Sequence, residues 1–478
     1  MEPLIRQVRL RAWLYLILLP LAGCYHYRPQ PLLPPSVETR YRSRNLADPG
    51  LKEFIDAQNV GKPASWPPSE LDLDTLTLVA FYFHPDLDAA RARLAAAEAA
   101  VITASTKPNP ATGSAGGYTD AAPAPYVLRF GLDWTLETAG KREHRTRRAR
   151  SLSEGARFSL GETAWQVRSR VRAALLDHLL ASRELELLRR EQEVRREALK
   201  LYEERLAAGE ISQPEVDVLR TSLTLVEVTS QRAAGLVQET RTALETALGV
   251  APGALNGIRL AWKSLEKPPG EDALPLHSVQ RAGLLNRLDI QRLLAEYAAS
   301  ENALQLEAAR QYPDIRISPG YSFGDGNNSY FIGPGFPLPL RDRNQGPIAE
   351  AEARRQEAAA RFLAQQASAI EQVERALIRY RTALADFRDA DSRLRTLLEE
   401  RERAVQVQIQ AGEADQLALA GVRLEAVAAA RARLNALRAT QSALGALEDA
   451  VQYPLESGIA LPAVPTANPR ERSGGARP

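Results

Sequence analysis

Three short stretches of the chain alternate apolar and polar positions, which is the period-2 pattern of a strand with one apolar face. A fourth stretch, at 111–118, is small and glycine-rich and is also expected to be a strand. The clearest alternation carries large apolar side chains at Tyr126, Leu128, Phe130, Leu132, Trp134 and Leu136. A later stretch repeats the pattern and ends at Pro337 and Pro339, which offer no N–H for sheet pairing. We therefore expect strands at 111–118, 126–136, 313–323 and 330–338.

Each pair of strands is followed by a long segment that has the spacing of a helix. The first runs without proline from Lys141 to about Ala208, and its apolar side chains recur three and four positions apart, as in a coiled-coil seam. The seam consists of Leu160, Ala164, Val167, Val171, Leu175 and Leu179. At about 1.5 Å per residue this helix is ~100 Å long, too long for a globular core. A second long helix is expected over Ile348–Gln410.

The helices that follow the long ones are only about half as long. Glu215–Leu248 rises ~50 Å, so it ends about halfway back along its partner. The irregular segment Ala251–Leu276 begins at that midpoint, and Asn286–Arg310 then adds ~37 Å, which nearly restores the height. We expect tall helical hairpins with a belt of irregular structure around the middle.

The two halves of the chain repeat one order of elements: helix, strand, turn, strand, long helix, tight turn and helix. The tight turns share the letters Ala-Gly-Glu, at 208–210 and again at 411–413. The expected divisions are a signal peptide (1–23), a lipidated linker and equatorial segment (24–70), repeat 1 (71–250), a second equatorial segment (251–285), repeat 2 (286–453) and a disordered tail (454–478). The expected fold class is mainly α with transmembrane β.

The first 23 residues have the composition of a secretory signal. Their basic start is made by Arg6, Arg9 and Arg11. The apolar run Ala12–Leu19 is too short to span a membrane in the mature protein. Cys24 follows Leu21-Ala22-Gly23, which resembles a bacterial lipobox, so we expect it to be lipidated; the alternative is a plain signal peptide with an incidental cysteine. Tyr25, rather than Asp, at the next position permits sorting to the outer membrane.

Four strands of about ten residues have the length that a tilted barrel strand needs to cross a bilayer. Four strands cannot close a barrel, and open sheet edges are not tolerated in lipid. If the strands span the membrane, the chain must therefore oligomerise, and three copies would supply twelve strands. The alternative is an ordinary soluble sheet, which the secretory signal and the very long helices disfavour.

Composition excludes several classes of protein. The 478 residues carry 25% charged and only 6% aromatic side chains, and the middle of the chain is rich in Ala, Leu, Arg and Glu, which suits long helices. The net charge of +2 argues neither for nor against a nucleic-acid partner. One cysteine excludes a disulfide framework and a cysteine zinc site. The histidines show no ligand spacing and no nucleophile or phosphate-loop motif is present, so we expect neither an enzyme nor a cofactor. The histidines are His26, His84, His144, His178 and His277.

A basic cluster opens the first long helix. Its members are Lys141, Arg142, Arg145, Arg147, Arg148 and Arg150. Beside a membrane strand, a collar near anionic lipid headgroups explains this cluster better than a nucleic acid does, because export removes the nucleic-acid partner.

Over nearly the whole mature chain the sequence resembles the TolC-like outer-membrane efflux factors, in particular their cobalt–zinc–cadmium type. The resemblance is carried by 136–142 (LETAGKR), by 337–346 (PLPLRDRNQG) and by the hairpin turns at Gly209 and Gly412. It implies a homotrimer with a twelve-stranded outer-membrane β-barrel and a periplasmic α-barrel, in a Gram-negative-type bacterium. It also implies two partners, a periplasmic adaptor (membrane fusion) protein and an inner-membrane pump of the RND type.

The resemblance places a pore constriction at the hairpin turns. Some members carry aspartates just beyond the second turn, but the matching positions here are Ala418 and Gly421, so that gate is not carried over. Nearby carboxylates are candidates instead, because threefold repetition would turn any inward-facing one into a ring of negative charge that favours cations. The candidates are Glu215, Asp217, Glu413 and Asp415. Alternatively, they are solvated carboxylates that the helix dipole stabilises at helix N-termini.

The expected function is a passive conduit for small solutes, and the type resemblance favours heavy-metal cations. The tips of the adaptor are expected to dock near Leu206, Gly209, Ile409 and Gly412. A type I protein-secretion or multidrug channel of the same fold stays open, because the pore chemistry barely differs. A periplasmic adaptor, by contrast, would show one hairpin and no duplicated strand pairs.

Overall fold

The computed structural model describes residues 27–58, 66–118, 120, 126–262, 264–270, 287–324, 326–455, 466 and 468–470. It divides the chain into two compact units, residues 1–44 and residues 45–478. The expected signal peptide, Cys24 and most of the expected disordered tail lie outside the described residues. The smaller unit contains α2 (Pro34–Arg42), which begins at a proline, a residue suited to the first helical turn, and buries none of its side chains.

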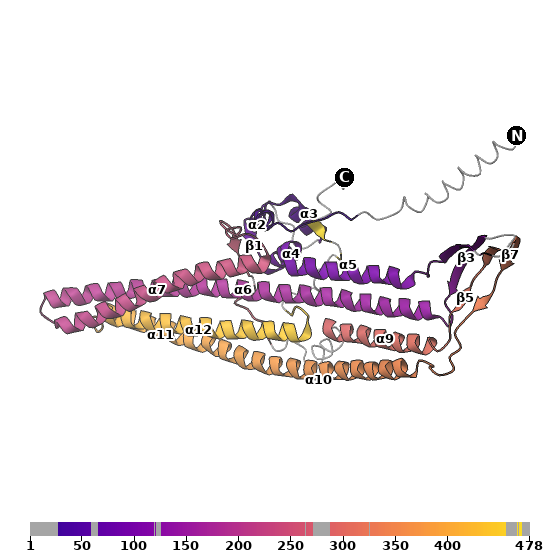
Figure 1. Cartoon of the computed structure of the whole chain (residues 1–478). Coiled ribbons are helices and arrows are strands. Elements are labelled where there is room, and N and C mark those ends of the chain that lie inside the picture. Colours follow the sequence, from indigo (N-terminus) through magenta and orange to yellow (C-terminus); the bar gives the residue numbers. More distant parts are fainter. Residues whose placement is uncertain are drawn as a thin grey trace. The chain divides into compact units, whose positions relative to one another are not determined.

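In the larger unit the elements form two similar series (Figure 1). The first comprises α3 (Pro49–Ala57), β1 (Glu70–Leu71), α4 (Leu73–Phe83), α5 (Pro85–Ser105), β2 (Ala111–Tyr118), β3 (Tyr126–Leu136), α6 (Lys141–Ala207) and α7 (Gln213–Leu248), with β4 (Arg259–Leu260) after it. The second comprises α9 (Leu288–Ala309), β5 (Ile315–Ile317), β6 (Gly320–Gly324), β7 (Asn327–Phe331), β8 (Pro334–Gly335), α10 (Gln345–Asp389), the π-helical turn η3 (Ala390–Leu394), α11 (Arg395–Gln410) and α12 (Gln416–Val451).

The helix α6 is the axis around which the larger unit is packed. Five of the six residues of its predicted seam are buried and expose 2% or less, namely Leu160, Ala164, Val167, Val171 and Leu175, while Leu179 is half-buried. α6 contacts α5 and α9 near the strands, and it contacts α7 and α12 toward the hairpin turns (Figure 1). Full burial of such a side chain contributes about 1.5–3 kcal/mol, so the seam is a major source of stability.

The short helix α4 forms the centre of the main hydrophobic core. All of its residues except Asp74 are buried, as expected for a helix that is apolar on every side. Its N-terminus is capped by Asp72, whose carboxylate accepts a hydrogen bond from the Thr75 N–H at 2.9 Å. Pro85 then opens α5 and turns the chain alongside α6.

The half-length helices end at mid-height, as their lengths predict. α7 ends at Gly249, whose φ is +73°, and a Cβ there would lie 3.0 Å from the carbonyl oxygen of Phe83 and from the Cα of His84. The end of α7 therefore meets the start of α5. In the same way, α12 meets the start of α9, where the Leu288 N–H donates to the Gln452 Oε1 at 2.6 Å. Thus α5 continues the line of α7 toward the strands, and α9 continues the line of α12 in the same way.

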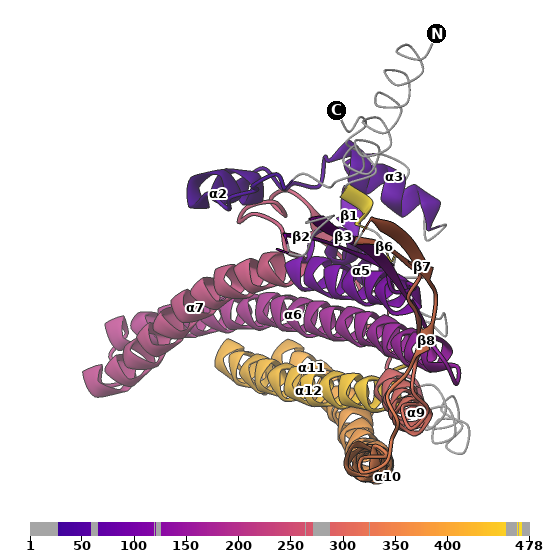
Figure 2. The same ribbon diagram turned by 45° about the vertical axis from the view of Figure 1, so that its right-hand side comes forward.

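The two hairpins, α6–α7 and α10/α11–α12, run as two separate pairs (Figure 2). Their principal contact is that of α12 with α6. A buried ion pair lies in this contact, where the Arg168 guanidinium is 2.9 Å from the Glu448 carboxylate and Arg172 is 3.3 Å from it. All three side chains expose 5% or less, so the charges compensate one another away from water.

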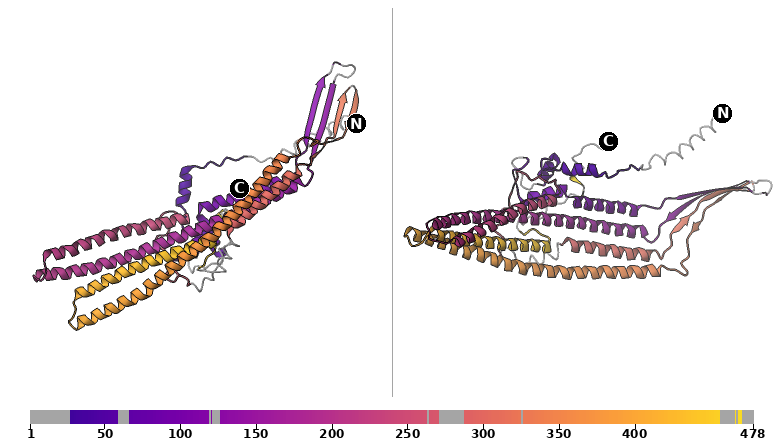
Figure 3. Two further views of the ribbon diagram at one scale, coloured as in Figure 1. Left: turned by 90° about the horizontal axis from the view of Figure 1, so that it is seen from below. Right: turned by 60° about the vertical axis from the view of Figure 1, so that its left-hand side comes forward.

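The hairpin turns lie at one end of the larger unit, and one antiparallel sheet extends from the other end (Figure 3). β3 pairs with β2 on one edge, and its other edge pairs first with β6 and then with β5. β7 adds to β6, and β8 adds to β5. The two series are thus joined through β3 and β6, in the middle of the sheet.

Three predicted elements are less regular in the structure than in the sequence analysis. The expected strand 313–323 is divided into β5 and β6 by Ser318-Pro319, and the expected strand 330–338 ends at Phe331 and resumes only for β8. Proline has no N–H to donate to a neighbouring strand, which accounts for the break at Pro319. The expected single helix Ile348–Gln410 begins earlier, at Gln345, and is interrupted by η3.

Candidate channel-forming surfaces

One face of β3 is apolar and open. Its large side chains expose between 40% and 65% of their surface and are Tyr126, Leu128, Phe130, Trp134 and Leu136. A water-soluble protein rarely leaves so many neighbouring apolar side chains uncovered, so this face is suited to a partner or to lipid.

The register of the sheet carries the same apolar face across both series. Leu128 lies opposite Phe323, Phe130 lies opposite Tyr321, and Tyr321 lies opposite Tyr330. Directly opposed residues share a face in an antiparallel sheet. The rings of Tyr321 and Tyr330 lie with their centroids 5.4 Å apart. The apolar surface is therefore continuous over three strands.

The other face of β3 is polar. Arg129 lies opposite Ser322, and Thr135 lies opposite Arg316. The carboxylate of Asp133 accepts a hydrogen bond from the Ser318 hydroxyl on this face. Alternation of apolar and polar faces is the pattern of strands that meet lipid on one side and a water-filled lumen on the other.

The sheet has two free edges within one chain. Among the described strands, β2 pairs only with β3, while β7 pairs only with β6 and β8 only with β5. Each backbone group left unpaired in lipid costs several kcal/mol, so this sheet cannot sit in a bilayer by itself. Within a bilayer, strands from further copies would have to pair with both edges.

The outer helices also carry exposed apolar stripes. On α7 the exposed side chains are Val218, Leu225, Val228 and Leu236, and on α10 they are Leu363, Ile370 and Ile378. Val218 and Leu225 are seven residues apart, as are Leu363 and Ile370, which is the spacing of a coiled-coil seam. Each stripe lies on the outermost helix of its own pair and has no partner among the described residues.

Both hairpin turns have the same backbone geometry. Gly209 and Gly412 have φ values of +73° and +75°, which glycine adopts without steric cost. In each turn the next N–H reaches back five residues, from Glu210 to the Arg205 carbonyl at 2.9 Å and from Glu413 to the Gln408 carbonyl at 2.8 Å. These bonds satisfy the last free carbonyls of α6 and α11, so the turns are rigid helix ends.

Two of the four candidate gate carboxylates are engaged within the first hairpin. Glu215 accepts hydrogen bonds from the Ser212 N–H and hydroxyl, both at 2.7 Å, and these bonds lower the pKa of Glu215. Asp217 accepts from the Gln213 amide at 2.9 Å and lies 3.3 Å from Arg220. Both therefore serve the start of α7, in agreement with the alternative of solvated carboxylates at a helix N-terminus.

The other two candidates flank the second turn and differ from each other. Asp415 caps α12 by accepting from the Ala418 N–H at 2.8 Å, and it lies 2.5 Å from Arg205 of the first hairpin. The bond from Ala418 and the pairing with Arg205 lower the pKa of Asp415. The Glu413 carboxylate, in contrast, is exposed and has no bonding partner among the described residues. It is the candidate whose charge is least compensated.

The predicted adaptor-contact residues have unequal exposure. Gly209 and Gly412 are exposed, with nothing close to the position of a Cβ. Leu206 is half-buried and packs beside Leu199 and Val216 inside its own hairpin. Ile409 is half-buried on α11. The two glycines are thus the more accessible pair.

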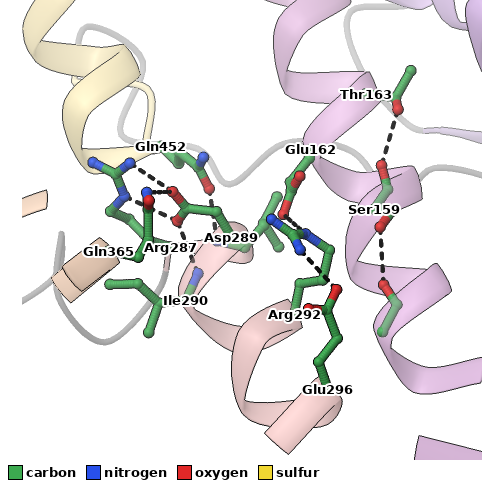
Figure 4. A network of polar contacts seen from close by, with 12 residues as sticks. Ser159, Glu162, Thr163, Arg287, Asp289, Ile290, Arg292, Glu296, Gln365 and Gln452 are labelled. Atoms are coloured by element: carbon green, nitrogen blue, oxygen red, sulfur yellow. Dashed lines mark hydrogen bonds and ion pairs between the residues drawn. The ribbon is translucent and has the colours of Figure 1, made fainter. Parts of the chain in front are cut away.

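A polar network fixes the start of α9 against three other helices (Figure 4). The buried Arg287 donates to Asp289 at 2.7 Å, and the Gln365 amide of α10 donates to the same carboxylate at 2.6 Å. Arg292 bridges Glu162 of α6 at 2.9 Å and Glu296 at 2.8 Å. This network fixes the start of α9 in one position relative to α6 and α10.

Neither a metal site nor a membrane-spanning helix is present in the described part of the chain. No group of three or more His, Cys, Asp or Glu side chains is arranged there to hold a metal ion. Within the same residues, no helix is both long enough and apolar enough to cross a bilayer. His178 is buried between α6 and α7, where burial lowers its pKa and its ring lies 3.3 Å from the Thr240 hydroxyl.

Sequence reasoning missed Arg205, which connects the two hairpins. Its partner Asp415 lies 210 residues away in the chain, so no local pattern indicates the pair. Reasoning also missed the close contact of Gly320 with the ring of Phe331, where a Cβ would lie 2.2 Å from a ring carbon. A glycine at the start of an otherwise apolar strand is the one signal that could have pointed to it.

Part of the chain is similar to known outer-membrane proteins. Residues 83–250 match the family described as outer membrane efflux protein. The cobalt-zinc-cadmium resistance protein CzcC of Cupriavidus metallidurans is 25% identical over 285 residues, which is 59% of this chain and 66% of CzcC. The match thus spans slightly less than two thirds of that relative.

Solved structures show the same fold at lower identity. The outer membrane protein VceC of Vibrio cholerae superimposes with a TM-score of 0.65 at 21% identity, covering 80% of this chain and 97% of VceC. CusC superimposes with a TM-score of 0.63 at 16% identity, covering 90% of this chain and 98% of CusC. The fold is therefore that of the TolC-like outer-membrane channels, mainly helical with a smaller β part.

Proposed function

Because residues 83–250 match the outer membrane efflux protein family, we propose that the chain is the outer-membrane channel of a tripartite efflux system. It acts as a passive conduit and catalyses no reaction. The observation that carries the proposal is the sheet with one exposed apolar face, one polar face and two free edges, on the same unit as two long helical hairpins. Such a sheet needs lipid on one side and further copies at its edges.

Three copies form the channel. Three sheets give a closed twelve-stranded barrel, in which β2 of one copy pairs with the β7/β8 edge of the next. The stripes on α7 and α10 support the same arrangement below the membrane, because they lie on opposite outer helices and are both apolar. The α7 stripe of one copy would then contact the α10 stripe of the next copy. A contact between two unlike surfaces forms a closed ring when the rotation from one copy to the next adds up to a full turn.

The direction of the channel follows from the ends of the larger unit. The sheet lies in the outer membrane, and the hairpins extend through the periplasm to the turns at Gly209 and Gly412. A lipid on Cys24 adds a tether to the same membrane.

A periplasmic adaptor and an RND-type inner-membrane pump complete the system. The adaptor docks at the turn end, where Gly209 and Gly412 are exposed and Leu206 and Ile409 are half-buried. The pump supplies the energy, since a water-filled conduit has no means of coupling to an energy source.

Heavy-metal cations are the proposed cargo. The name of CzcC, a cobalt-zinc-cadmium resistance protein, supports this choice. In a ring of three, the exposed Glu413 carboxylates would place negative charge at the turn end and favour cations there. The uncompensated charge of Glu413 is the feature of this chain that agrees with a cationic cargo.

Paired cysteine substitutions on β3 test the placement of the sheet. With Phe130→Cys on the apolar face and Arg129→Cys on the polar face, a membrane-impermeant maleimide is applied to intact cells. We expect Arg129→Cys to react through the water-filled lumen and Phe130→Cys to stay unreactive in lipid. Equal labelling of both positions, together with a monomeric mass in detergent, would contradict the proposal.

Single-channel recording tests the gate and the preference for cations. Glu413→Lys should lower the selectivity for cations, because the reversed charge repels them at the mouth. The matched control is Glu210→Lys, at the same place in the turn of the first hairpin. Unchanged conductance and selectivity for Glu413→Lys and Asp415→Lys would remove both carboxylates from the gate.

A further inference from the structure

A pocket of about 310 Å³ lies at the junction of the sheet and the helices. It is formed by the segment between α5 and β2, the last residues of β3 and the first turn of α6. Lys107, Trp134, Leu136, Gly140 and Arg142 are among the residues that line it. The pocket thus joins the membrane-facing strand to the basic start of the long helix.

Most charged groups around this pocket are already paired. Lys141 lies 2.6 Å from the Asp314 carboxylate, and Glu137 accepts from Arg145 at 2.7 Å. Glu143 is paired with Arg147. The carboxylates on the lining are therefore neutralised by neighbours, which leaves the remaining cations to set the charge of the pocket.

Two cations on the lining have no such partner. Within the described residues, neither the Lys107 ammonium nor the Arg142 guanidinium forms an ion pair or a side-chain hydrogen bond, and both residues are exposed. The pocket therefore carries two uncompensated positive charges. An anionic group placed between them would gain from both, because a basic pocket beside a membrane-spanning segment favours anionic headgroups.

Part of the pocket lining is apolar. Trp134 and Leu136 expose 52% and 40% of their surface and belong to the apolar face of β3. Aromatic side chains at the end of a membrane strand lie at the level of the lipid headgroups. The pocket therefore offers an apolar wall on the bilayer side and positive charge on the aqueous side.

We propose that this pocket binds an anionic glycerophospholipid of the leaflet that faces the periplasm. The lipid phosphate lies between Lys107 and Arg142, and the start of its acyl chains lies against Trp134 and Leu136. This inference rests on the proposed function, because it needs the sheet to be in the membrane. The proposal gives the basic start of α6 a specific ligand, whereas the sequence indicated only that its positive charges lie near anionic lipid headgroups.

Fluorescence quenching by brominated lipids tests the proposal on the full-length protein in phosphatidylcholine bilayers. A minor fraction of brominated phosphatidylglycerol is compared with the same fraction of brominated phosphatidylcholine, and a Trp134→Phe variant isolates the signal of Trp134. The other tryptophans of the larger unit, Trp66, Trp165 and Trp262, lie in its helical part and belt. We expect phosphatidylglycerol to quench Trp134 with an apparent affinity about fivefold to tenfold higher.

The double variant Lys107→Gln/Arg142→Gln should reduce this preference to about one. The matched control, Arg148→Gln/Arg150→Gln, removes two exposed arginines of the same helix that have no ion-pair partner among the described residues, and should keep it. Equal loss in both variants would overturn the site and leave only general attraction of anionic lipid. Inorganic phosphate at constant ionic strength should not compete; removal of the preference by phosphate would overturn a lipid as the occupant.

The outcomes also separate this inference from the proposed function. Quenching of Trp134 by both lipids to the same extent would leave the sheet in the membrane but overturn the lipid site. No quenching of Trp134 by either lipid would place the strand outside the bilayer, and both proposals would then fail.

Discussion

The Arg205 guanidinium of the first hairpin lies 2.5 Å from the Asp415 carboxylate at the start of α12. This ion pair ties the two hairpins of one chain together next to their turns. Both side chains are partly exposed, at 39% and 48%, so the pair contributes no more than about 1 kcal/mol. An interaction of this size holds the tips together and still allows them to separate.

Arg205→Ala should therefore increase opening at the turn end. Loss of one such pair is worth up to about fivefold in the ratio of open to closed states, and three copies would act together. Single-channel recording measures the open probability. Arg220→Ala is the matched control, because Arg220 pairs with Glu203 and Asp217 inside the first hairpin only. An equal effect of both substitutions would exclude a specific role for the bridge.

The bridge should be insensitive to pH over the neutral range. The pKa of Asp415 is lowered, so its contribution is complete above the ordinary aspartate value of about 4 and is lost as the pH falls through the lowered pKa. We expect the open probability of the wild type to be constant from neutral pH down to about 5 and to rise only below about 4. Asp415→Asn should show the high value throughout. A transition near neutral pH would contradict this assignment.

Gly249→Ala should destabilise the larger unit by about 2 kcal/mol or more, because the new Cβ would meet Phe83 and His84 and the residue has a φ of +73°. Gly257→Ala separates the two causes. It has a φ of +76° but nothing within 4 Å of a Cβ, so its cost should be only about 1 kcal/mol. Thermal unfolding followed by circular dichroism measures both, and equal costs would show that the contact with α5 is not tight.

Gly320→Ala should prevent normal pairing of β6 with β7, because a Cβ there would lie 2.2 Å from the Phe331 ring. The double variant Gly320→Ala/Phe331→Ala removes the obstacle and should recover most of the trimer. The yield of trimer in detergent measures the effect. Recovery by the second substitution is the decisive result, since a purely conformational role of the glycine would give none.

Glu448→Ala should cost about 3–5 kcal/mol, because it leaves Arg168 and Arg172 buried without their counter-charge. Glu425→Ala is the control: Glu425 forms an exposed pair with Arg401, which should contribute less than about 1 kcal/mol. Thermal or urea unfolding gives both values. Similar costs for the two variants would mean that the buried charges are hydrated.

Periodicity predicted much of the fold. The seam of α6 from Leu160 to Leu175 is buried as expected, since a spacing of three and four places these side chains on one side of a helix. The alternation at Tyr126–Leu136 likewise predicted β3 and its exposed apolar face. Both patterns depend only on the spacing of residues within one helix or strand, so they can be predicted from that segment of the sequence alone.

The pairing of the candidate gate carboxylates could not be predicted in the same way. The sequence placed the carboxylates of Glu215 and Asp415 near the turns. It did not indicate that Glu215 forms a capping box at the start of α7, or that Asp415 pairs with Arg205. Such pairings depend on how distant segments pack. The division of the second strand pair around Pro319 was also missed, although proline offered a signal for it.

The π-helical turn η3 has no counterpart in α6, which runs without interruption from Lys141 to Ala207. A π-turn adds a residue to the helical repeat, so every side chain of α11 is rotated about the axis relative to a continuous helix. The first and second hairpins therefore present unlike outer surfaces although both belong to the same repeated order of elements. In a closed ring of three chains, the six hairpins alternate between two kinds. A partner that binds in six copies would have to dock in two non-equivalent ways.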